Sequence, residues 1–189
     1  TSMSESVIIG YRAAEANTSG SEIIAIGYQA YDNADTENSN IAIGINALGG
    51  AVNGGEFNVA VGHNSLDALT SGDKNTVIGY DAGGALTTGS ANTIIGENAG
   101  SNGALTGDDN TVVGKIAGYA LTSGHSNTLI GRHAASALTT GVRNVALGMG
   151  ANDSAADGEN DNIAIGYNAM ASASLAGGEY NTAIGNYSL

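Results

Sequence analysis

The phrase Asn-Thr-Val-Ile-Gly at Asn75–Gly79 decides the fold, because it recurs eleven times along the 189 residues with β-branched and aliphatic residues replacing one another. A fixed period of this length is typical of a solenoid, in which each repeat forms one coil that stacks on the next. We number the coils one to eleven by their closing glycines. These stand 17 to 19 residues apart, at Gly10, Gly27, Gly44, Gly62, Gly79, Gly96, Gly114, Gly131, Gly148, Gly166 and Gly185.

The composition suits a stack of thin coils. The chain has 30 Gly, eight Tyr and one Phe, with no Pro, Cys or Trp. Side chains this small cannot fill a thick core, but a coil needs only a thin core because it packs on its neighbours. We therefore expect one β-solenoid domain over residues 1–189. Without Cys the chain has no disulfides and no Cys-based metal or redox site.

The charge balance excludes several classes of partner. Five Lys and Arg against eighteen Asp and Glu give a net charge of −13. Phosphate-rich surfaces would repel such a chain, so we expect neither nucleic acid nor an anionic membrane as a partner. The sequence also lacks the long apolar run that membrane insertion requires.

Two positions of the phrase are aliphatic or β-branched in every coil. The fourth position is Ile9, Ile26, Ile43, Val61, Ile78, Ile95, Val113, Ile130, Leu147, Ile165 or Ile184. The second position is Val7, Ile24, Ile41, Val59, Thr76, Thr93, Thr111, Thr128, Val145, Ile163 or Thr182. Alternate residues of a strand share a face, so we expect both positions to face the inside of the coil.

The third position should then face outward, yet it contains no polar residue. It reads Ile8, Ala25, Ala42, Ala60, Val77, Ile94, Val112, Leu129, Ala146, Ala164 and Ala183. Strands that are apolar on both faces are normally buried on both. We therefore expect self-association around an axis, with Ala25, Ala42, Ala60, Val77, Val112, Ala146, Ala164 and Ala183 at its centre. The alternative is that small apolar residues are tolerated on a solvent face.

The rest of each coil also repeats. Three residues after the closing Gly stands Ala or Ser, as in Ala82 and Ser65, which indicates a corner with little room. A Gly such as Gly72 or Gly89 marks a turn three residues before the next phrase. A second apolar row predicts a second short strand in each coil, at Val52, Leu69, Leu86, Leu121, Leu138 and Leu175.

Asn opens nine of the eleven phrases, at Asn40, Asn58, Asn75, Asn92, Asn110, Asn127, Asn144, Asn162 and Asn181. Stacked Asn side chains can form an amide ladder that satisfies the backbone of a turn, so we assign them a structural role. Coils one and two have Ser6 and Ile23 instead. Because terminal repeats are commonly atypical, we expect residues 1–39 to be less regular and to act as a cap.

These motifs resemble known repeats. The phrase Asn-Thr-x-Ile-Gly-x-x-Ala, with Leu-Thr-Thr-Gly at Leu86–Gly89 before the next Asn, resembles the repeats of bacteriophage tail-fibre proteins. It is also similar to the head repeats of trimeric autotransporter adhesins, although the coil is longer here. Both resemblances cover essentially the whole chain. They imply a left-handed parallel β-roll of about eleven coils of 17–18 residues, packed as a homotrimer with the small position central.

Many such fibres continue into a C-terminal self-cleaving chaperone domain. This chain contains none and ends four residues after Gly185, which favours a piece of a longer fibre.

Motifs of enzymes, cofactor sites and metal sites are not found. The sequence has no Gly-x-Ser-x-Gly elbow, no phosphate loop and no His-Glu-x-x-His, and its three His are too few for a repeated site. Asp153, Asp157, Glu159 and Asp161 could offer oxygen ligands to Ca²⁺, but their spacing fits no EF-hand loop. We interpret them as a solvated acidic loop and expect no catalysis, no cofactor and no bound metal.

Variation concentrates just after each closing Gly. We predict a receptor-binding column at Tyr11, Tyr28, His63, Tyr80, Lys115, Arg132 and Tyr167. Exposed Tyr suits sugar rings, because it offers an apolar face and a polar tip; the alternative is that these Tyr only shield the coil edge.

The sequence thus predicts a non-enzymatic trimeric shaft or head that attaches to a glycan or protein receptor on a cell surface. We expect it in a virion tail fibre or on a bacterial surface. The alternatives are a bacterial adhesin head, an ice-binding solenoid and a polysaccharide-degrading fibre. For ice binding, Thr76, Thr93, Thr111 and Thr128 form a ladder, which we expect to point inward. For degradation, paired carboxylates would be needed on adjacent coils.

Overall fold

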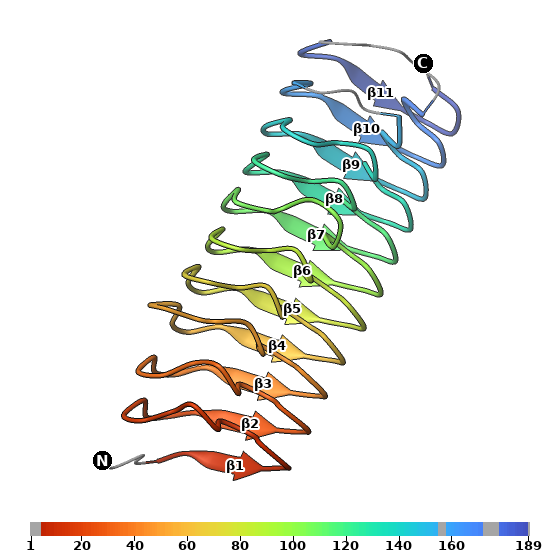
Figure 1. Ribbon diagram of the computed structural model, residues 1–189. Helices are drawn as coiled ribbons and strands as arrows, with labels where there is room; N and C mark the ends of the chain where they lie inside the picture. The colour runs from red at the N-terminus through yellow and green to blue at the C-terminus, as the bar shows by residue number, and fades with distance from the viewer. Residues whose placement is uncertain (1–4, 155–157, 172–177, 189) are drawn as a thin grey trace.

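The computed structural model describes residues 5–154, 158–171 and 178–188, which form a parallel β-solenoid without helix. Each coil contributes one strand of three residues to a single sheet of eleven strands in chain order. The coils stack as a rod, with the two chain ends at opposite ends (Figure 1). The strands are β1 (Val7–Ile9), β2 (Ile24–Ile26), β3 (Ile41–Ile43), β4 (Val59–Val61), β5 (Thr76–Ile78), β6 (Thr93–Ile95), β7 (Thr111–Val113), β8 (Thr128–Ile130), β9 (Val145–Leu147), β10 (Ile163–Ile165) and β11 (Thr182–Ile184).

The strands stack in a fixed register. Thr76 of β5 pairs with Thr93 of β6, which pairs with Thr111 of β7, and the same holds at every step of the sheet. Equivalent residues of the phrase therefore form columns that run along the rod. At the usual strand spacing of about 4.8 Å, the sheet is roughly 50 Å long.

The predicted inside and outside of the strand are reversed. The third position is fully buried inside the coil from Ala25 to Ala164, whereas the second and fourth positions keep solvent exposure throughout. The expectation that Ala25, Ala42, Ala60, Val77, Val112, Ala146, Ala164 and Ala183 lie on an axis between copies is therefore wrong. The opening Asn is also buried, and the third position shares its face because side chains alternate along a strand. At the third position the interior holds Ala in most coils and Val, Ile or Leu in the others, while Tyr31 is a larger side chain that is also fully buried.

The Asn ladder is confirmed. The Asn92 backbone N–H donates to Asn75 Oδ1 at 3.0 Å, and Asn92 Nδ2 donates to the same oxygen at 3.2 Å. Asn92 Nδ2 also donates to the carbonyl of the turn residue Gly107 at 3.0 Å. Similar bonds link consecutive Asn from Asn58 to Asn181. The ladder thus satisfies buried amides and ties each strand to the turn of the following coil.

The closing glycines are required by both space and backbone conformation. Gly27 has a φ of +139°, and a Cβ there would lie 2.3 Å from the carbonyl oxygen of Gly44 in the next coil. The same close approach recurs from Gly10 to Gly166, so each of these glycines meets the next one across the coil boundary. No L side chain fits this column, which explains why the phrase always ends in Gly.

The return segment between corner and turn is not a second strand. Val52, Leu69, Leu86, Leu121 and Leu138 are buried as expected, while Leu175 lies outside the described residues. However, the described part of this segment shows only one isolated bridge, between Leu86 and Leu105. Thr70 and Ser71 both donate to the Thr87 carbonyl, so the backbone turns where an extended ladder would alternate. The predicted second strand is therefore wrong, although its apolar row does form core.

Coils one and two differ from the rest in side chains more than in backbone. β1 and β2 pair in the same register as the later strands. Ile23 is buried where later coils have Asn, and its N–H donates to Ser6 Oγ at 3.1 Å, so Ser6 supplies the oxygen that Asn supplies elsewhere.

Candidate interaction surface

The outer face of the sheet carries the second and fourth positions of every coil and holds no charged residue. It combines aliphatic side chains with five Thr, at Thr76, Thr93, Thr111, Thr128 and Thr182. None of its residues is fully buried, and Ile78 and Leu147 are each 39% exposed in the middle of the sheet. Two columns about 50 Å long cover on the order of 500 Å². The largest apolar patch on a typical monomer covers about 300–600 Å² and is often functional, so this face is a candidate interaction surface.

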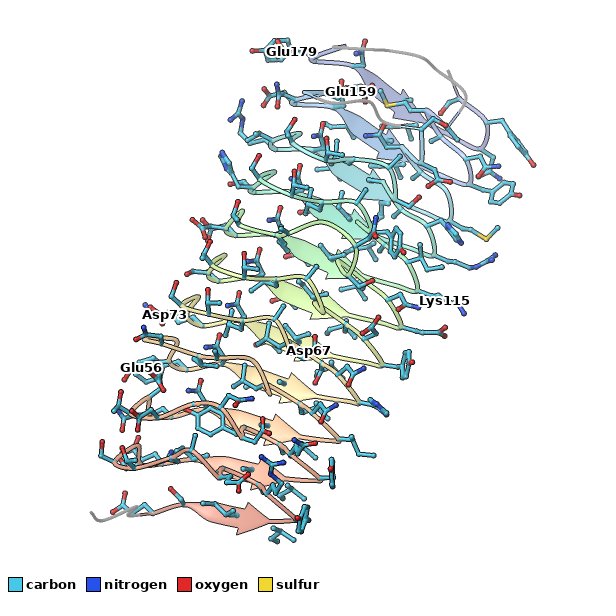
Figure 2. All side chains as sticks on the ribbon, in the orientation of Figure 1. Glu56, Asp67, Asp73, Lys115, Glu159 and Glu179 are labelled. Atoms are coloured by element: carbon cyan, nitrogen blue, oxygen red, sulfur yellow. The ribbon has the colours of Figure 1, made fainter. Side chains whose placement is uncertain are left out.

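Two exposed columns border this face. The pre-strand rim, directly before the first position, consists of Glu5, Glu22, Ser39, Phe57, Lys74, Ala91, Asp109, Ser126, Arg143, Asp161 and Tyr180. The post-strand rim, directly after the closing Gly, consists of Tyr11, Tyr28, Ile45, His63, Tyr80, Glu97, Lys115, Arg132, Met149, Tyr167 and Asn186. Figure 2 shows Lys115 at the edge where the strands end. All residues of both rims are exposed or half-buried.

The predicted receptor residues lie together in the post-strand rim. Tyr11, Tyr28, His63, Tyr80, Lys115, Arg132 and Tyr167 are all exposed. The rings of Tyr11 and Tyr28 stack with centroids 5.7 Å apart, and those of His63 and Tyr80 lie 5.6 Å apart. The column therefore offers aromatic pairs at two separate levels, and Tyr167 forms an edge-to-face pair with Tyr187 near the C-terminal end.

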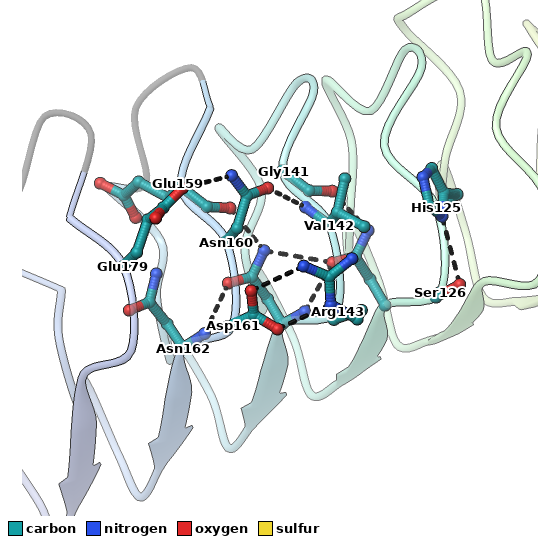
Figure 3. A network of polar contacts seen from close by, with 12 residues as sticks. His125, Ser126, Gly141, Val142, Arg143, Glu159, Asn160, Asp161, Asn162 and Glu179 are labelled. Atoms are coloured by element: carbon teal, nitrogen blue, oxygen red, sulfur yellow. Dashed lines mark hydrogen bonds and ion pairs between the residues drawn. The ribbon is translucent and has the colours of Figure 1, made fainter.

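Basic residues gather on the rims. Four of the five Lys and Arg lie there: Lys74 and Arg143 before the strand, and Lys115 and Arg132 after it. Lys115 Nζ is 2.8 Å from Glu97 Oε1 in the preceding coil. Arg143 donates to both carboxylate oxygens of Asp161, at 2.7 Å each, and this hydrogen bonding lowers the pKa of Asp161 (Figure 3).

A second polar ladder, which the sequence analysis missed, runs along the surface beside the turn glycines. The Glu56 N–H donates to Asp73 Oδ1 at 2.8 Å, and the Asp73 N–H donates to Ser90 Oγ at 3.1 Å. Near the C-terminal end, the Val142 N–H donates to Asn160 Oδ1 at 2.9 Å (Figure 3). Each acceptor stands two residues before the opening Asn, and this recurring position was the signal that the sequence offered.

The predicted solvated acidic loop is wrong at Glu159, whereas Asp153 and Asp161 keep partial solvent exposure. Glu159 is 1% exposed, and Asp161 pairs with Arg143, while Asp157 lies outside the described residues. In the described ranges no three His, Asp or Glu side chains gather as a metal site requires.

Carboxylates on adjacent coils approach each other at the corner. Asp67 follows Ser65 in one coil and Asp81 precedes Ala82 in the next. Burial raises the pKa of Asp67, and the charge of Asp81 raises it further. This pair lies at the corner, away from the outer sheet face.

Comparison with known protein families, with curated proteins and with solved structures finds no match to this chain. Within the described residues no helix is long and apolar enough to cross a membrane.

Proposed function

We propose that this chain is a segment of a homotrimeric, left-handed β-roll fibre that attaches to a host or target cell without catalysis. A phage tail fibre is the first candidate, and the head of a bacterial surface adhesin is the second form of the same function. Both place the chain outside the cell. The observation that carries the proposal is the apolar outer face of the sheet, which the single chain leaves open to solvent along its whole length.

Self-association accounts for this face best. A parallel sheet is normally covered on both faces, and here the coil core covers only one. A straight face of eleven equivalent levels fits a second copy, which carries the same straight face. Three copies around one axis would bury all three faces at once and leave only coil surfaces in water.

A substitution on the outer face tests the assembly. Ile95→Asp would place three carboxylates around the axis, so we expect loss of the trimer by sedimentation while the coil itself stays folded. Thr88→Asp is the matched control, because Thr88 is exposed on the return segment of a neighbouring coil. A wild-type mass of 18.6 kDa in dilute buffer would contradict the homotrimer.

Receptor binding would use the post-strand rim, in three copies per fibre. Its aromatic pairs fit sugar rings. The overall affinity of the fibre rises when several weak contacts engage at the same time. The test replaces Tyr28, Tyr80 and Tyr167 by Ser and measures adsorption to cells and binding to a glycan array. Unchanged adsorption by an intact trimer would make this segment a passive shaft.

Ice binding is a second candidate, now favoured by one observation. Thr76, Thr93, Thr111 and Thr128 face outward, contrary to our expectation, and pair in register on neighbouring strands. The neighbouring fourth position is aliphatic, so the face has one Thr column and one apolar column over these coils. Ice binding needs the face free, so thermal hysteresis by a monomer would support it, whereas a trimer without hysteresis would exclude it.

A further inference from the structure

The two rims of the outer face, when paired coil by coil, bring no like charges together and join one pair of opposite charges. We infer that they meet between copies, so that the pre-strand rim of one copy lies against the post-strand rim of the next. This inference rests on the proposed trimer and specifies its orientation, register and contacts. The contact line, which we call the seam, would occur three times in each fibre.

Cyclic symmetry fixes which residues meet in the seam. When three parallel copies turn their sheets toward one axis, the right edge of each face meets the left edge of its neighbour. A closed ring involves no shift along the axis, and we take the strands to run straight across the rod, so each coil meets the same coil of the next copy. Every seam level therefore joins the two rim residues of one coil number.

The charges agree with this pairing. Coil seven places Asp109 opposite Lys115, and coil five places Lys74 opposite the ring of Tyr80. Coil four places Phe57 opposite His63. No described coil brings two like charges together in this arrangement. Such residues set orientation and register more than affinity, because an exposed ion pair contributes little to the free energy of association.

The opposite orientation is disfavoured by the same residues. In an antiparallel pair each rim would lie against the same rim of the other copy in reversed order. Coil two would then lie opposite coil ten, and coil six opposite coil six. Glu97 would face Glu97 of the other copy at the centre, and Glu22 would face Asp161. Lys74 would face Asp109, which has the opposite charge. Parallel copies bring no like charges together at any described level. Like charges in direct contact are destabilising, so the rims select parallel copies.

Cysteine cross-linking tests the seam directly, because the chain has no Cys of its own. The double variant Asp109→Cys, Lys115→Cys should form a covalent trimer on mild oxidation, seen on a non-reducing gel. The two positions are six residues apart across the strand, roughly 15–20 Å, which is too far for a disulfide within one chain. The control Lys115→Cys, Asp161→Cys lies three coils out of register and should stay uncross-linked.

The outcomes separate the two proposals. A trimer by sedimentation that does not cross-link through the first pair overturns the seam but leaves the trimer standing. A monomer by sedimentation overturns the assembly itself.

Mixing two charge-reversed variants gives an independent test of the seam. Trimers that combine Asp109→Lys chains with Lys115→Glu chains should exceed the random proportion in native mass spectrometry, because only mixed seams pair opposite charges. A random proportion would also overturn the seam.

Discussion

The strand side and the return side of each coil obey different length rules. From the opening Asn to the small corner residue the distance is always seven positions, as in Asn40 to Ala47 and Asn162 to Ala169. From the corner to the next Asn it varies between ten positions, as in Ala82 to Asn92, and twelve, as in Ala169 to Asn181. All the variation in coil length therefore lies in the return segment.

Contacts explain the contrast. On the strand side the Asn, the three strand residues, the Gly and the corner each stack on their counterpart in the next coil. An extra residue there would shift every later column. The return segment is anchored mainly by one buried aliphatic row and scattered hydrogen bonds, so the backbone can bulge toward solvent.

The largest expected difference comes from insertions. One Gly inserted between Ile95 and Gly96 would turn the following side chains to the opposite face, so we expect loss of cooperative folding. One Gly inserted between Asn53 and Gly54, which are both exposed on the return side, should cost less than about 1 kcal/mol. Thermal melts followed by circular dichroism compare the two. Equal tolerance of both insertions would remove the distinction between the sides.

Gly→Ala substitutions should also affect the strand side and the return side differently. Gly96→Ala would bring a Cβ within 2.6 Å of the Gly114 backbone at a φ of +135°, so we expect a loss of about 3 kcal/mol or more. Gly54→Ala has a φ of +103° but meets nothing within 4 Å, so only the backbone strain of about 1 kcal/mol remains. Urea unfolding measures both, and a Gly96 variant as stable as the Gly54 variant would contradict the stacking argument.

Asn side chains offer a milder comparison. Asn92→Ala removes the oxygen that accepts from the Asn110 backbone and side chain, leaving buried donors unpaired. We expect a loss of about 2–3 kcal/mol in urea unfolding. Asn102→Ala, on the exposed return segment, should change stability by under about 0.5 kcal/mol.

The smallest expected effect concerns the corner, where the sides join. Burial raises the pKa of Asp67 above its ordinary value of 3.8, so the folded state holds this proton more tightly than the unfolded state. The stabilising effect is present at low pH and is lost as pH rises through the folded pKa. Asp67→Asn should therefore be more stable than wild type at neutral pH, by less than about 1 kcal/mol, and lose that advantage in acid. Chemical unfolding at several pH values would show it, and a constant difference across pH would contradict it.

The sequence was sufficient to predict whatever depends on the period. The solenoid, its coil boundaries, the small corner and the Asn ladder follow because stacking forces equal residues into columns, and columns are visible in a single sequence. The period does not show which face of the sheet a column of side chains lies on. Ile95 and Ile94 are both apolar, and only the burial of Asn92 decides which of them turns inward.

Three further errors have similar causes. Leu105 is buried in the return row but stands five residues before Asn110, whereas Leu86 stands six before Asn92, so strict spacing missed it. The second strand was predicted from that apolar row, yet burial of one residue per coil does not require extended backbone. The surface ladder through Asp73 and Ser90 was missed because its members share only an acceptor atom, and not a residue type.

The direction of the inter-strand bonds has a mechanical consequence. These bonds run along the rod, and the two chain ends lie at its opposite ends (Figure 1). A pull on the ends therefore loads all ten strand pairs in series, with the same force on each. A single chain would yield one coil at a time, each releasing roughly 50 Å of slack. Such stepwise extension absorbs mechanical work, so a rod that is held at both ends would lengthen coil by coil under load before either attachment broke.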